Sequence, residues 1–431
     1  MLTINGPEDS INHFGISESV NVQAVANDSY HEYGAVVTLT IESGHAVIEN
    51  VGVVSSLVNN STTEKKVEIK GYVGAVSGSS SENIEGNIGG DTIKVYTSEQ
   101  LKGLALSSVV LGLNDKTIDI QNDINVSGSW IPFGFDSKNP FSGTIKGNGH
   151  TISGLNSDGF ENAGLGTPVS SSFTDATGIP YGFIGTAAGN LYIENLTLEV
   201  SFNRPNEAFV GGLVGLYNNV SNGTTGSYTD YVKNVTIKGT IIGKDKVGGF
   251  YGANGKDFAA ANIEHKYESC VNEAEVIAKA GNGRVGGICG VAQGQFGEEY
   301  IRNSACASAY GLESNYSFHA ESITKFINCT NRGHIVSMSG SFGAGGIMCI
   351  NVATGNFVFE SCSSTGVLEG NKTGKLIANS NIEDSIFTKY YAEGGTPIEW
   401  DGSRSRITVD GETLIVKKST SVNSKTDYTH Q

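Results

Sequence analysis

Histidines and carboxylates are the residues of this sequence that could perform hydrolysis, but their spacing gives little support for it. The pair His31-Glu32 matches the start of the zinc-protease pattern His-Glu-x-x-His, yet Ala35 stands where the second histidine belongs. Glycosidases need two carboxylates at a fixed separation on one face. Acids such as Glu273, Glu275 and the turn residue Asp245 do not recur at equivalent positions of neighbouring segments. We expect no catalytic residue, no metal site and no cofactor, with a polysaccharide lyase or glycosidase as the alternative.

Aromatic side chains in or beside three long inserts are candidates for binding. The inserts span Ser157–Pro180, Asn218–Thr229 and Val291–Ser322. Tyrosine is favoured at recognition surfaces because it combines apolar area with a hydrogen-bonding tip. We expect the inserts to form a side wall or groove that binds a host or environmental glycan or protein; the alternative is that the aromatic rings only pin the inserts to the surface below. The candidate ligand-binding residues are Tyr217, Tyr228, Tyr300, Tyr310, Tyr316 and Phe318.

A repeat must position these inserts. In each copy a small polar residue or cysteine precedes a short alternating run, and a Gly-Gly pair follows at a nearly constant distance. The interval between the third and fourth copies is longer than the others, and the third insert accounts for the difference. Segments with one layout and little identity are typical of a repeat array. The copies begin at Asn195, Asn234, Cys270, Cys329 and Cys362.

The alternation within each copy has the period of a strand. Val235 with Ile237, and Val276 with Ala278, are two positions apart, and the glycines would destabilise a helix. We predict an all-β, right-handed parallel β-helix in which coils stack about 4.8 Å apart. Gly-Gly would turn corners where a side chain would collide with the next coil. The five residues that begin the repeat would then form one structural ladder inside the coil.

The composition excludes several classes of function. The chain has 431 residues, a net charge of −16 and no block of lysines or arginines, so we do not expect nucleic acid as a partner. No apolar run of about eighteen residues could span a membrane, and no signal peptide is visible, so we expect any secretory segment to lie outside this sequence. Five of the six cysteines occupy repeat positions whose side chains are poorly oriented for bridges, which predicts free, buried thiols.

The rest of the chain divides around the β-helix. Residues 1–90 alternate without the repeat and predict a small β-sandwich-like module. Residues 91–384 would form the β-helix, with a capping helix near 97–106 in which Thr97 and Gln100 make a capping box. Residues 385–431 would form a C-terminal β cap, a hairpin turning at Asp410-Gly411, and a frayed tail.

Several motifs together resemble one family. The run YTSEQL…IDIQNDINVSGSWIPFG…PFSGTIKGNGHTISGL is followed by units reading GFIG, GGLVG, GGFYG and GGICG. This arrangement resembles the GLUG-motif parallel β-helix proteins, which occur among bacterial adhesins and in the non-catalytic part of immunoglobulin-A peptidases. The resemblance covers residues 93–380. It implies an extracellular protein, on the cell surface or attached to the outer membrane, of a gut-type Gram-negative bacterium such as a Bacteroides relative.

Together these observations predict a non-enzymatic, monomeric surface protein, an adhesin that binds a glycan or a protein through loops on the side of a β-helix. Fold and function are only loosely coupled, so the family resemblance specifies the architecture better than the task. A β-helix carbohydrate-active enzyme and a structural or pilus-associated stalk subunit are the two alternatives.

Overall fold

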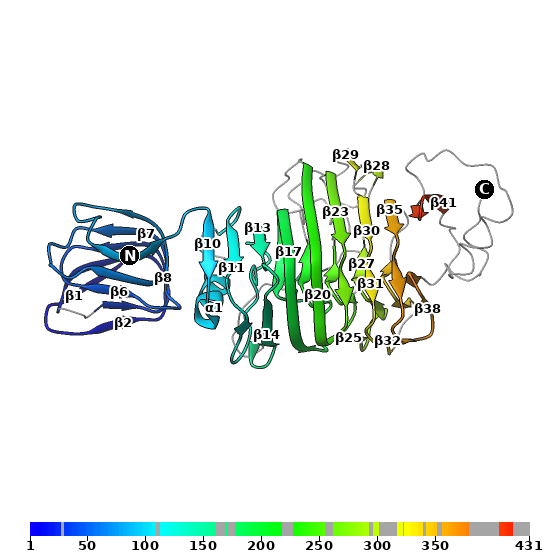
Figure 1. Cartoon of the computed structure of the whole chain (residues 1–431), viewed down its shortest axis with the longest axis horizontal. Coiled ribbons are helices and arrows are strands. Elements are labelled where there is room, and N and C mark those ends of the chain that lie inside the picture. The colour runs from blue at the N-terminus through cyan, green and yellow to red at the C-terminus, as the bar shows by residue number, and fades with distance from the viewer. Residues whose placement is uncertain are drawn as a thin grey trace.

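The computed structural model is an elongated, almost entirely β structure in which one coiled unit follows another along a common axis (Figure 1). It describes residues 1–26, 30–108, 113–160, 169–170, 177–217, 227–254, 262–292, 296–300, 317–321, 323–338, 342–350, 356–378 and 405–416. These residues include one helix, and no helix among them is long and apolar enough to cross a membrane.

The N-terminal unit is a nine-stranded sheet that curls around its own apolar core, and we call it the short-coil module. Its strands are β1 (Leu2–Gly6), β2 (Ile11–His13), β3 (Ile16–Val25), β4 (Tyr30–Glu32), β5 (Ala35–Ile41), β6 (Ala46–Ile48), β7 (Val53–Asn59), β8 (Val67–Ser77) and β9 (Ile84–Ile88).

The predicted β-sandwich is wrong for this module. Sandwiches are built from antiparallel strands, whereas every pairing here is parallel. Ala35 pairs with Val53, and Val53 pairs with Tyr72, so each pairing advances the chain by one short coil. Residues 1–90 therefore contain a repeat of their own, much shorter than the repeat that follows.

The second unit, which we call the long coil stack, is a 23-stranded curled sheet. Its strands are β10 (Thr92–Val95), β11 (Thr117–Ile120), β12 (Ile124–Asn125), β13 (Phe141–Lys146), β14 (Thr151–Asn156), β17 (Ile184–Arg204), β19 (Val214–Tyr217), β20 (Ser227–Gly243), β22 (Tyr251–Ala253), β23 (Asn262–Glu268), β24 (Val271–Asn272), β25 (Glu275–Ala278), β27 (Cys289–Ala292), β30 (Ile323–Ile327), β31 (Thr330–Asn331), β32 (Ile335–Ser337), β34 (Met348–Ile350), β35 (Asn356–Glu360), β36 (Ser363–Ser364), β37 (Leu368–Glu369), β39 (Ile377–Ala378), β40 (Ser405–Val409) and β41 (Glu412–Val416).

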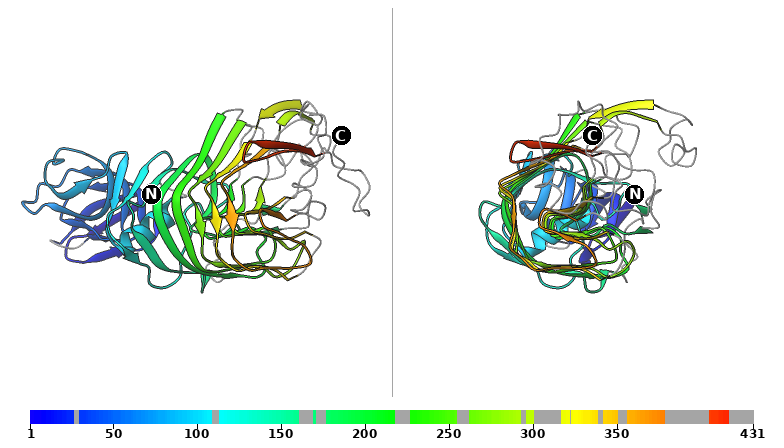
Figure 2. Two further views of the ribbon diagram at one scale, coloured as in Figure 1. Left: turned by 45° about the vertical axis from the view of Figure 1, so that its right-hand side comes forward. Right: turned by 90° about the vertical axis from the view of Figure 1, so that its right-hand side faces the viewer.

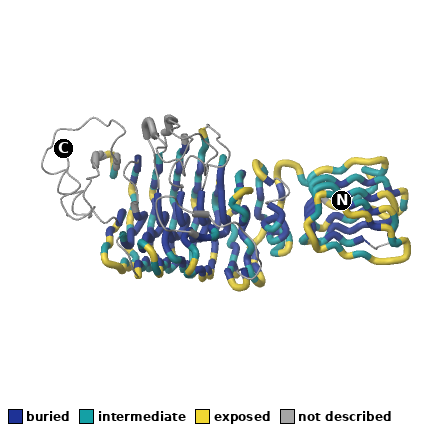
Figure 3. The backbone as a smooth tube through the Cα atoms, turned by 180° about the vertical axis from the view of Figure 1, so that it is seen from behind, coloured by how far each residue is buried: buried dark blue, intermediate teal, exposed yellow. Residues whose placement is uncertain are grey.

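Successive strands of the stack pair in parallel, one repeat apart, as in a β-helix. Leu198 pairs with Ile237, Ile237 with Asn272, and Asn272 with Asn331. Viewed along the axis the coils superimpose (Figure 2), and the backbone of the strands is largely buried while exposed residues gather at the turns (Figure 3). The all-β, parallel, β-helix-like architecture is as predicted.

Helix α1 (Ser98–Ser107) lies at the start of the stack. The Thr97 side chain accepts a hydrogen bond from the Gln100 backbone N–H, and the Gln100 side chain accepts one from the Tyr96 N–H. The first bond satisfies one of the donors that a helix leaves free at its N-terminus, and the second ties the preceding residue to the first turn. The predicted cap at Thr97 is confirmed, whereas the reciprocal bond from Gln100 goes to Tyr96 and not to Thr97 as a capping box requires. Leu101 and Leu104 are buried in a core shared with Val53 and Tyr72 of the short-coil module.

The Gly-Gly pairs stack as predicted, in a five-stranded parallel sheet. An added Cβ atom at Gly249 would lie 2.0 Å from the carbonyl oxygen of Gly287, and one at Gly287 would lie 2.1 Å from that of Gly346. No side chain fits at such distances, because the next coil occupies the space. The strands are β18 (Val210–Gly211), β21 (Val247–Gly248), β26 (Arg284–Gly286), β33 (Gly343–Gly345) and β38 (Thr373–Gly374).

The predicted ladder of asparagines and cysteines is wrong by one position. Lys233 pairs with Glu268, so Asn234 is equivalent to Ser269 and not to Cys270. Asn195 and Asn234 occupy an outer corner with φ of 55° and 51°, and Asn234 Nδ2 donates to Asn195 Oδ1 over 3.1 Å. Short polar side chains tolerate this left-handed backbone better than other non-glycine residues do.

The cysteines lie one position later and face the interior. Cys270 and Cys329 are fully buried and Cys362 is partly buried. The thiols of Cys329 and Cys362 each donate to a carbonyl of the preceding coil, Tyr267 O at 3.3 Å and Phe326 O at 3.2 Å. Because side chains alternate along a strand, a shift of one position separates an outer column from an inner one. The predicted free thiols are confirmed for the five described cysteines, of which Cys362 is only partly buried, and Cys306 lies outside the described residues.

A buried polar ladder does exist, at other residues. Asn272 Nδ2 donates to Asn331 Oδ1 over 2.8 Å, and Asn331 Nδ2 donates to Ser364 Oγ over 3.1 Å. Both asparagines are fully buried at equivalent positions of β24 and β31. The physical idea of the ladder therefore holds, but its residues follow the predicted ones by two positions.

Three further elements complete the description. β40 and β41 form the predicted hairpin that turns at Asp410-Gly411, and β40 adds to β35. β15 (Val169–Ser170) pairs with β16 (Thr177–Gly178), and β28 (Phe296–Tyr300) pairs with β29 (Ser317–Glu321), both antiparallel. The hairpin of β28 and β29 stands out from the side of the coils, as the right-hand view of Figure 2 shows.

Candidate ligand-binding cleft

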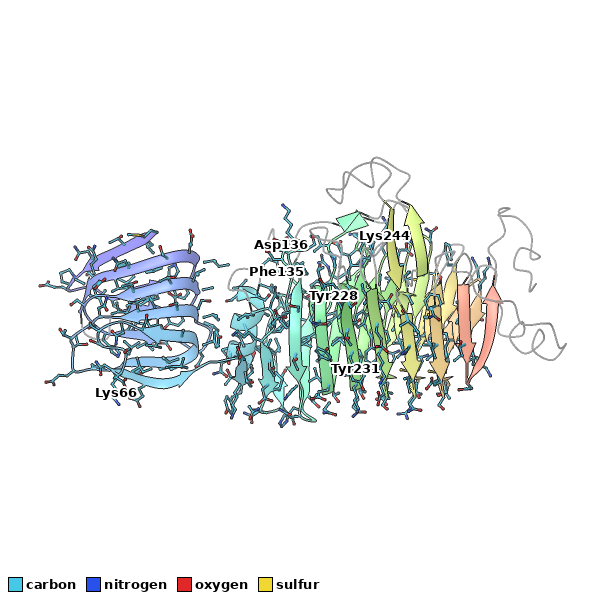
Figure 4. The ribbon with its side chains drawn as sticks, turned by 90° about the horizontal axis from the view of Figure 1, so that it is seen from above. Lys66, Phe135, Asp136, Tyr228, Tyr231 and Lys244 are labelled. Carbon is cyan, nitrogen blue, oxygen red and sulfur yellow. The ribbon has the colours of Figure 1, made fainter. Side chains whose placement is uncertain are left out.

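The predicted recognition residues are not gathered in one described surface. Tyr217 is fully buried and its hydroxyl donates to the carbonyl of Gly189, so its predicted contact with a ligand is wrong. The cause is the inward-facing register of β19, which sequence position beside an insert does not reveal. Tyr228 is partly buried and packs against the main core. It lies on β20 with Tyr231, and both residues are labelled in Figure 4.

The other four candidate ligand-binding residues lie in or near the third insert. Tyr300 lies in β28 and Phe318 in β29, within the projecting hairpin. Tyr310 and Tyr316 lie outside the described residues. The role of the side inserts in binding therefore stays a prediction.

The three acids named in the sequence analysis each contact a basic side chain. Glu273 lies 3.0 Å from Arg332, and Glu275 lies 3.2 Å from His334 of the next coil. Asp245 was expected in an ordinary turn but is buried against Arg284, whose Nε and backbone N–H both donate to it. All three contacts join neighbouring coils: Glu273 and Asp245 form ion pairs with arginines, and Glu275 lies against an imidazole nitrogen.

The clearest described hollow lies where the short-coil module meets α1 and the first strand of the stack. It has a volume of about 390 Å³, within the range of sites for small ligands. We call it the inter-unit cleft. Its lining residues are Asn50, Gly52, Val53, Ile69, Lys70, Gly71, Tyr72, Gly86, Ile88, Gly89, Thr92, Ile93, Lys94, Tyr96, Gln100 and Leu104.

Two tyrosines supply the aromatic surface of the inter-unit cleft. Tyr72 is 9% exposed and Tyr96 is 41% exposed. An added Cβ atom at Gly89 would lie 2.2 Å from Cε2 of Tyr72, so glycine at this position leaves room for the ring. Rings of this kind pack against apolar faces of a ligand while their hydroxyls form hydrogen bonds.

A hydrogen bond between the two units holds one polar side chain of the cleft, Gln100, in place. Gln100 Nε2 donates to the Lys70 carbonyl over 3.1 Å, which ties the first turn of α1 to β8. The Gln100 side chain thus joins the helix cap to the short-coil module. The cleft is also lined by Asn50, Lys70, Thr92 and Lys94, whose side chains can donate hydrogen bonds to oxygens of a ligand.

Charges near the cleft are balanced in pairs. Lys70 lies 3.4 Å from Glu49. Lys116 lies 2.9 Å from Asp91; its ammonium group lowers the pKa of Asp91, and the same hydrogen bond raises the pKa of Lys116. Burial raises the pKa of Tyr72, so its hydroxyl stays protonated and can donate. The cleft therefore offers hydrogen-bond donors and aromatic faces at neutral pH.

None of the side chains that line the inter-unit cleft is a carboxylate or an imidazole. The groups that act most often as general acids and bases, imidazoles and carboxylates, are thus absent from its described lining. The arrangement can hold a ligand with apolar faces and many oxygens through its tyrosine rings and nitrogen donors.

Sequence reasoning missed this cleft because its residues come from both units. Tyr96 directly preceded the predicted helix, and Lys70 and Tyr72 were within the predicted sandwich. A glycine precedes each coil of the short-coil module, and these glycines are almost evenly spaced, at Gly15, Gly34, Gly52 and Gly71. That spacing was the available signal for a second coil, and hence for a junction between two coils.

Comparisons with known proteins give distant likenesses. No family model matches the chain, so the resemblance to the GLUG-motif family stays a prediction. Halomucin of Haloquadratum walsbyi is 30% identical over 140 residues, which cover 32% of this chain and 1% of halomucin. The crystal structure of "a putative immunoglobulin A1 protease from Bacteroides ovatus" is similar with a TM-score of 0.44 and 15% identity, over 77% of this chain and 81% of that one. The match to halomucin thus spans a small fraction of that protein's length.

Proposed function

We propose that this protein is an extracellular surface protein that binds a saccharide, and that the inter-unit cleft is its binding site. The observation that carries the proposal is the cleft of about 390 Å³ that combines Tyr72 and Tyr96 with the side chains of Lys70, Lys94 and Gln100. A saccharide presents C–H faces to aromatic rings and oxygens to nitrogen donors. Both kinds of partner meet in this cleft.

The cleft binds its ligand without transforming it. Hydrolysis of a glycosidic bond needs two carboxyl groups beside the bond, and the described lining of the cleft contains none. The paired acids on the coils, Glu273 with Arg332 and Glu275 with His334, are engaged across neighbouring turns. These observations favour a binding protein over a polysaccharide lyase or glycosidase.

The extracellular location is part of the proposal and rests on the motif resemblance described above, together with a net charge of −16. An acidic surface favours solubility and disfavours adsorption to nucleic acid. The adhesin role follows if the bound saccharide belongs to a host or to a neighbouring cell. A monomer is sufficient, because all the lining residues come from one chain.

Glycan-array screening of the intact protein, followed by calorimetric titration of each bound glycan, tests the proposal. Tyr96→Ala removes an exposed ring at the cleft and should weaken binding by about tenfold or more. Tyr192→Ala is the matched control, because Tyr192 is 39% exposed on the long coil stack and outside the cleft. It should bind as the wild type does.

Two results would count against the proposal. If the protein binds no glycan on the array, the proposal that its ligand is a saccharide is refuted. Equal affinity of Tyr96→Ala and wild type, with binding lost when residues 291–322 are deleted, would assign recognition to the side inserts instead.

A further inference from the structure

Three side chains of the short-coil module form a hydrogen-bonded relay that the inter-unit cleft does not use. Ser17 Oγ, at the start of β3, lies 3.1 Å from His13 Nε2. The other ring nitrogen, His13 Nδ1, lies 2.9 Å and 3.0 Å from the two carboxylate oxygens of Glu32. The order is therefore hydroxyl, imidazole, carboxylate, with each contact at hydrogen-bond distance.

Parallel stacking brings the three together. β2 pairs with β4 so that His13 lies opposite Glu32, one coil apart. Gly15 turns the chain between β2 and β3 and returns Ser17 to the histidine that precedes it by four positions. The relay thus depends on the coil geometry and not on a local sequence motif.

Glu32 is held by hydrogen bonds from three other residues. It is fully buried, and it accepts hydrogen bonds from the Tyr30 hydroxyl at 2.5 Å and from the Gly34 N–H at 2.7 Å. Burial raises the pKa of Glu32, and its hydrogen bonds with Tyr30, His13 and Gly34 oppose that rise. The carboxyl group is fixed in one orientation, with the His13 ring as its third partner.

The hydroxyl end of the relay is accessible. The His13 side chain is 11% exposed and Ser17 is partly exposed. A Cβ atom added at Gly15 would lie 3.4 Å from His13 Nε2, so glycine at this position leaves that face of the ring uncovered by a side chain. Phe14, 71% exposed and stacked on Tyr33 with ring centroids 4.8 Å apart, provides an apolar surface next to His13.

We propose that Ser17, His13 and Glu32 form an acyl-transfer site that hydrolyses a small carboxylic ester. Such a site needs a nucleophile within reach of a base, and a third group that orients the base. Ser17 is the nucleophile, His13 the general base and Glu32 the positioning residue. The apolar acyl group of the ester would lie against Phe14. This activity is separate from saccharide binding in the inter-unit cleft.

The reaction balances with water as the second reactant. His13 Nε2 takes the proton of Ser17 Oγ as the oxygen bonds to the ester carbonyl carbon. Nε2 then gives that proton to the departing alkoxide as the carbon–oxygen bond of the ester breaks, which leaves an acyl-serine and an alcohol. Water attacks the acyl-serine through the same imidazole, and the carboxylic acid is released with the serine hydroxyl restored.

Stopped-flow reaction of the intact protein with p-nitrophenyl acetate, with mass spectrometry of the quenched protein, tests the site. We expect a burst of nitrophenol and acetylation located on the Ser17 peptide. Ser17→Ala should abolish both, and His13→Gln should slow acylation by about 100-fold or more. Ser19→Ala is the matched control, a serine two positions further along β3, and should react as the wild type does.

Glu32 requires a readout that separates positioning from folding. Glu32→Gln keeps the size of the side chain, and we expect a slower acylation step with an unchanged half-saturating ester concentration and a native circular dichroism spectrum. Acetylation at Ser17 that persists at the wild-type rate in His13→Gln would overturn the relay. So would the absence of acetylation at Ser17 in the folded wild-type protein, since the site is fully formed in this chain.

Discussion

Removing one member of the buried asparagine ladder should destabilise the long coil stack by several kcal/mol. Asn331 makes four side-chain hydrogen bonds: it accepts from Asn272 Nδ2 at 2.8 Å and from the Gly333 N–H at 3.2 Å, and it donates to the Gly333 carbonyl at 3.2 Å and to Ser364 Oγ at 3.1 Å. Two of these bonds join consecutive coils, and the other two join Asn331 to the backbone of Gly333. Asn331→Ala removes them together and leaves Asn272 facing a gap.

The magnitude follows from the number of bonds lost. Each buried hydrogen bond contributes about 1 kcal/mol net, and a buried donor left without its partner adds a further penalty of about 1 kcal/mol or more. Asn272 keeps two hydrogen bonds, because its Nδ2 also donates to the Ala274 carbonyl and its Oδ1 accepts from the Ala274 N–H. We therefore expect Asn331→Ala to lower the free energy of unfolding by about 3 to 5 kcal/mol.

Urea unfolding followed by circular dichroism measures this change. Asn328→Gly is the control: Asn328 is an exposed asparagine of the same coil with φ of 52°, where glycine carries no backbone penalty. It should change the free energy of unfolding by less than about 0.5 kcal/mol. A loss below about 1 kcal/mol in Asn331→Ala would refute the reasoning, because the ladder would then contribute little more than a surface contact.

Three other outcomes test separate parts of the structure. Asn234→Val at the outer, left-handed corner should cost about 1 to 2 kcal/mol in urea unfolding, whereas Asn234→Gly should cost little; equal effects would contradict the left-handed backbone. Burial raises the pKa of Cys329, and that of Cys349 to about 12, so iodoacetamide should label neither thiol at neutral pH until the protein is unfolded, as peptide mass spectrometry can determine. The hydrogen bond from Lys266 lowers the pKa of Glu268 from 4.5 to about 2, so its stabilising effect is present above 4.5 and is lost as the pH falls from 4.5 to 2; urea midpoints across that window should show a smaller pH dependence in Lys266→Ala.

Period-two alternation and recurring Gly-Gly pairs predicted parallel stacked strands, since both follow from local sterics that every coil shares. The helix cap at Thr97 and the turn at Asp410-Gly411 were also predictable, because each is fixed by a few neighbouring residues. Features that repeat, or that are settled locally, can therefore be predicted from this sequence.

Register and burial were harder to predict. Asn234 and Cys270 looked equivalent because they precede similar runs, but the pairing of Lys233 with Glu268 offsets them by one position, on different faces. Tyr217 looked like a loop residue and is a core residue of β19. Alternation tells which residues share a face of a strand, whereas only the pairing with the next coil tells which face is inside.

The short-coil module and the inter-unit cleft escaped prediction for a related reason. The module repeats at a shorter period than the stack, from Ala35 to Val53 to Tyr72, so a search at the longer period finds no repeat. The cleft brings Tyr72 of β8 beside Tyr96 and Gln100 at the start of α1. Residues from two units meet there only because the units share a core, which a linear pattern does not encode.

Hydroxyl-radical footprinting of the protein with its bound glycan tests the central claim most directly. Tyr96 and Tyr192 are 41% and 39% exposed, so in the free protein both should be oxidised at similar rates. With a saturating glycan we predict protection of Tyr96 in the inter-unit cleft and no change at Tyr192. Unchanged oxidation of Tyr96, with protection confined to residues 291–322, would contradict the account.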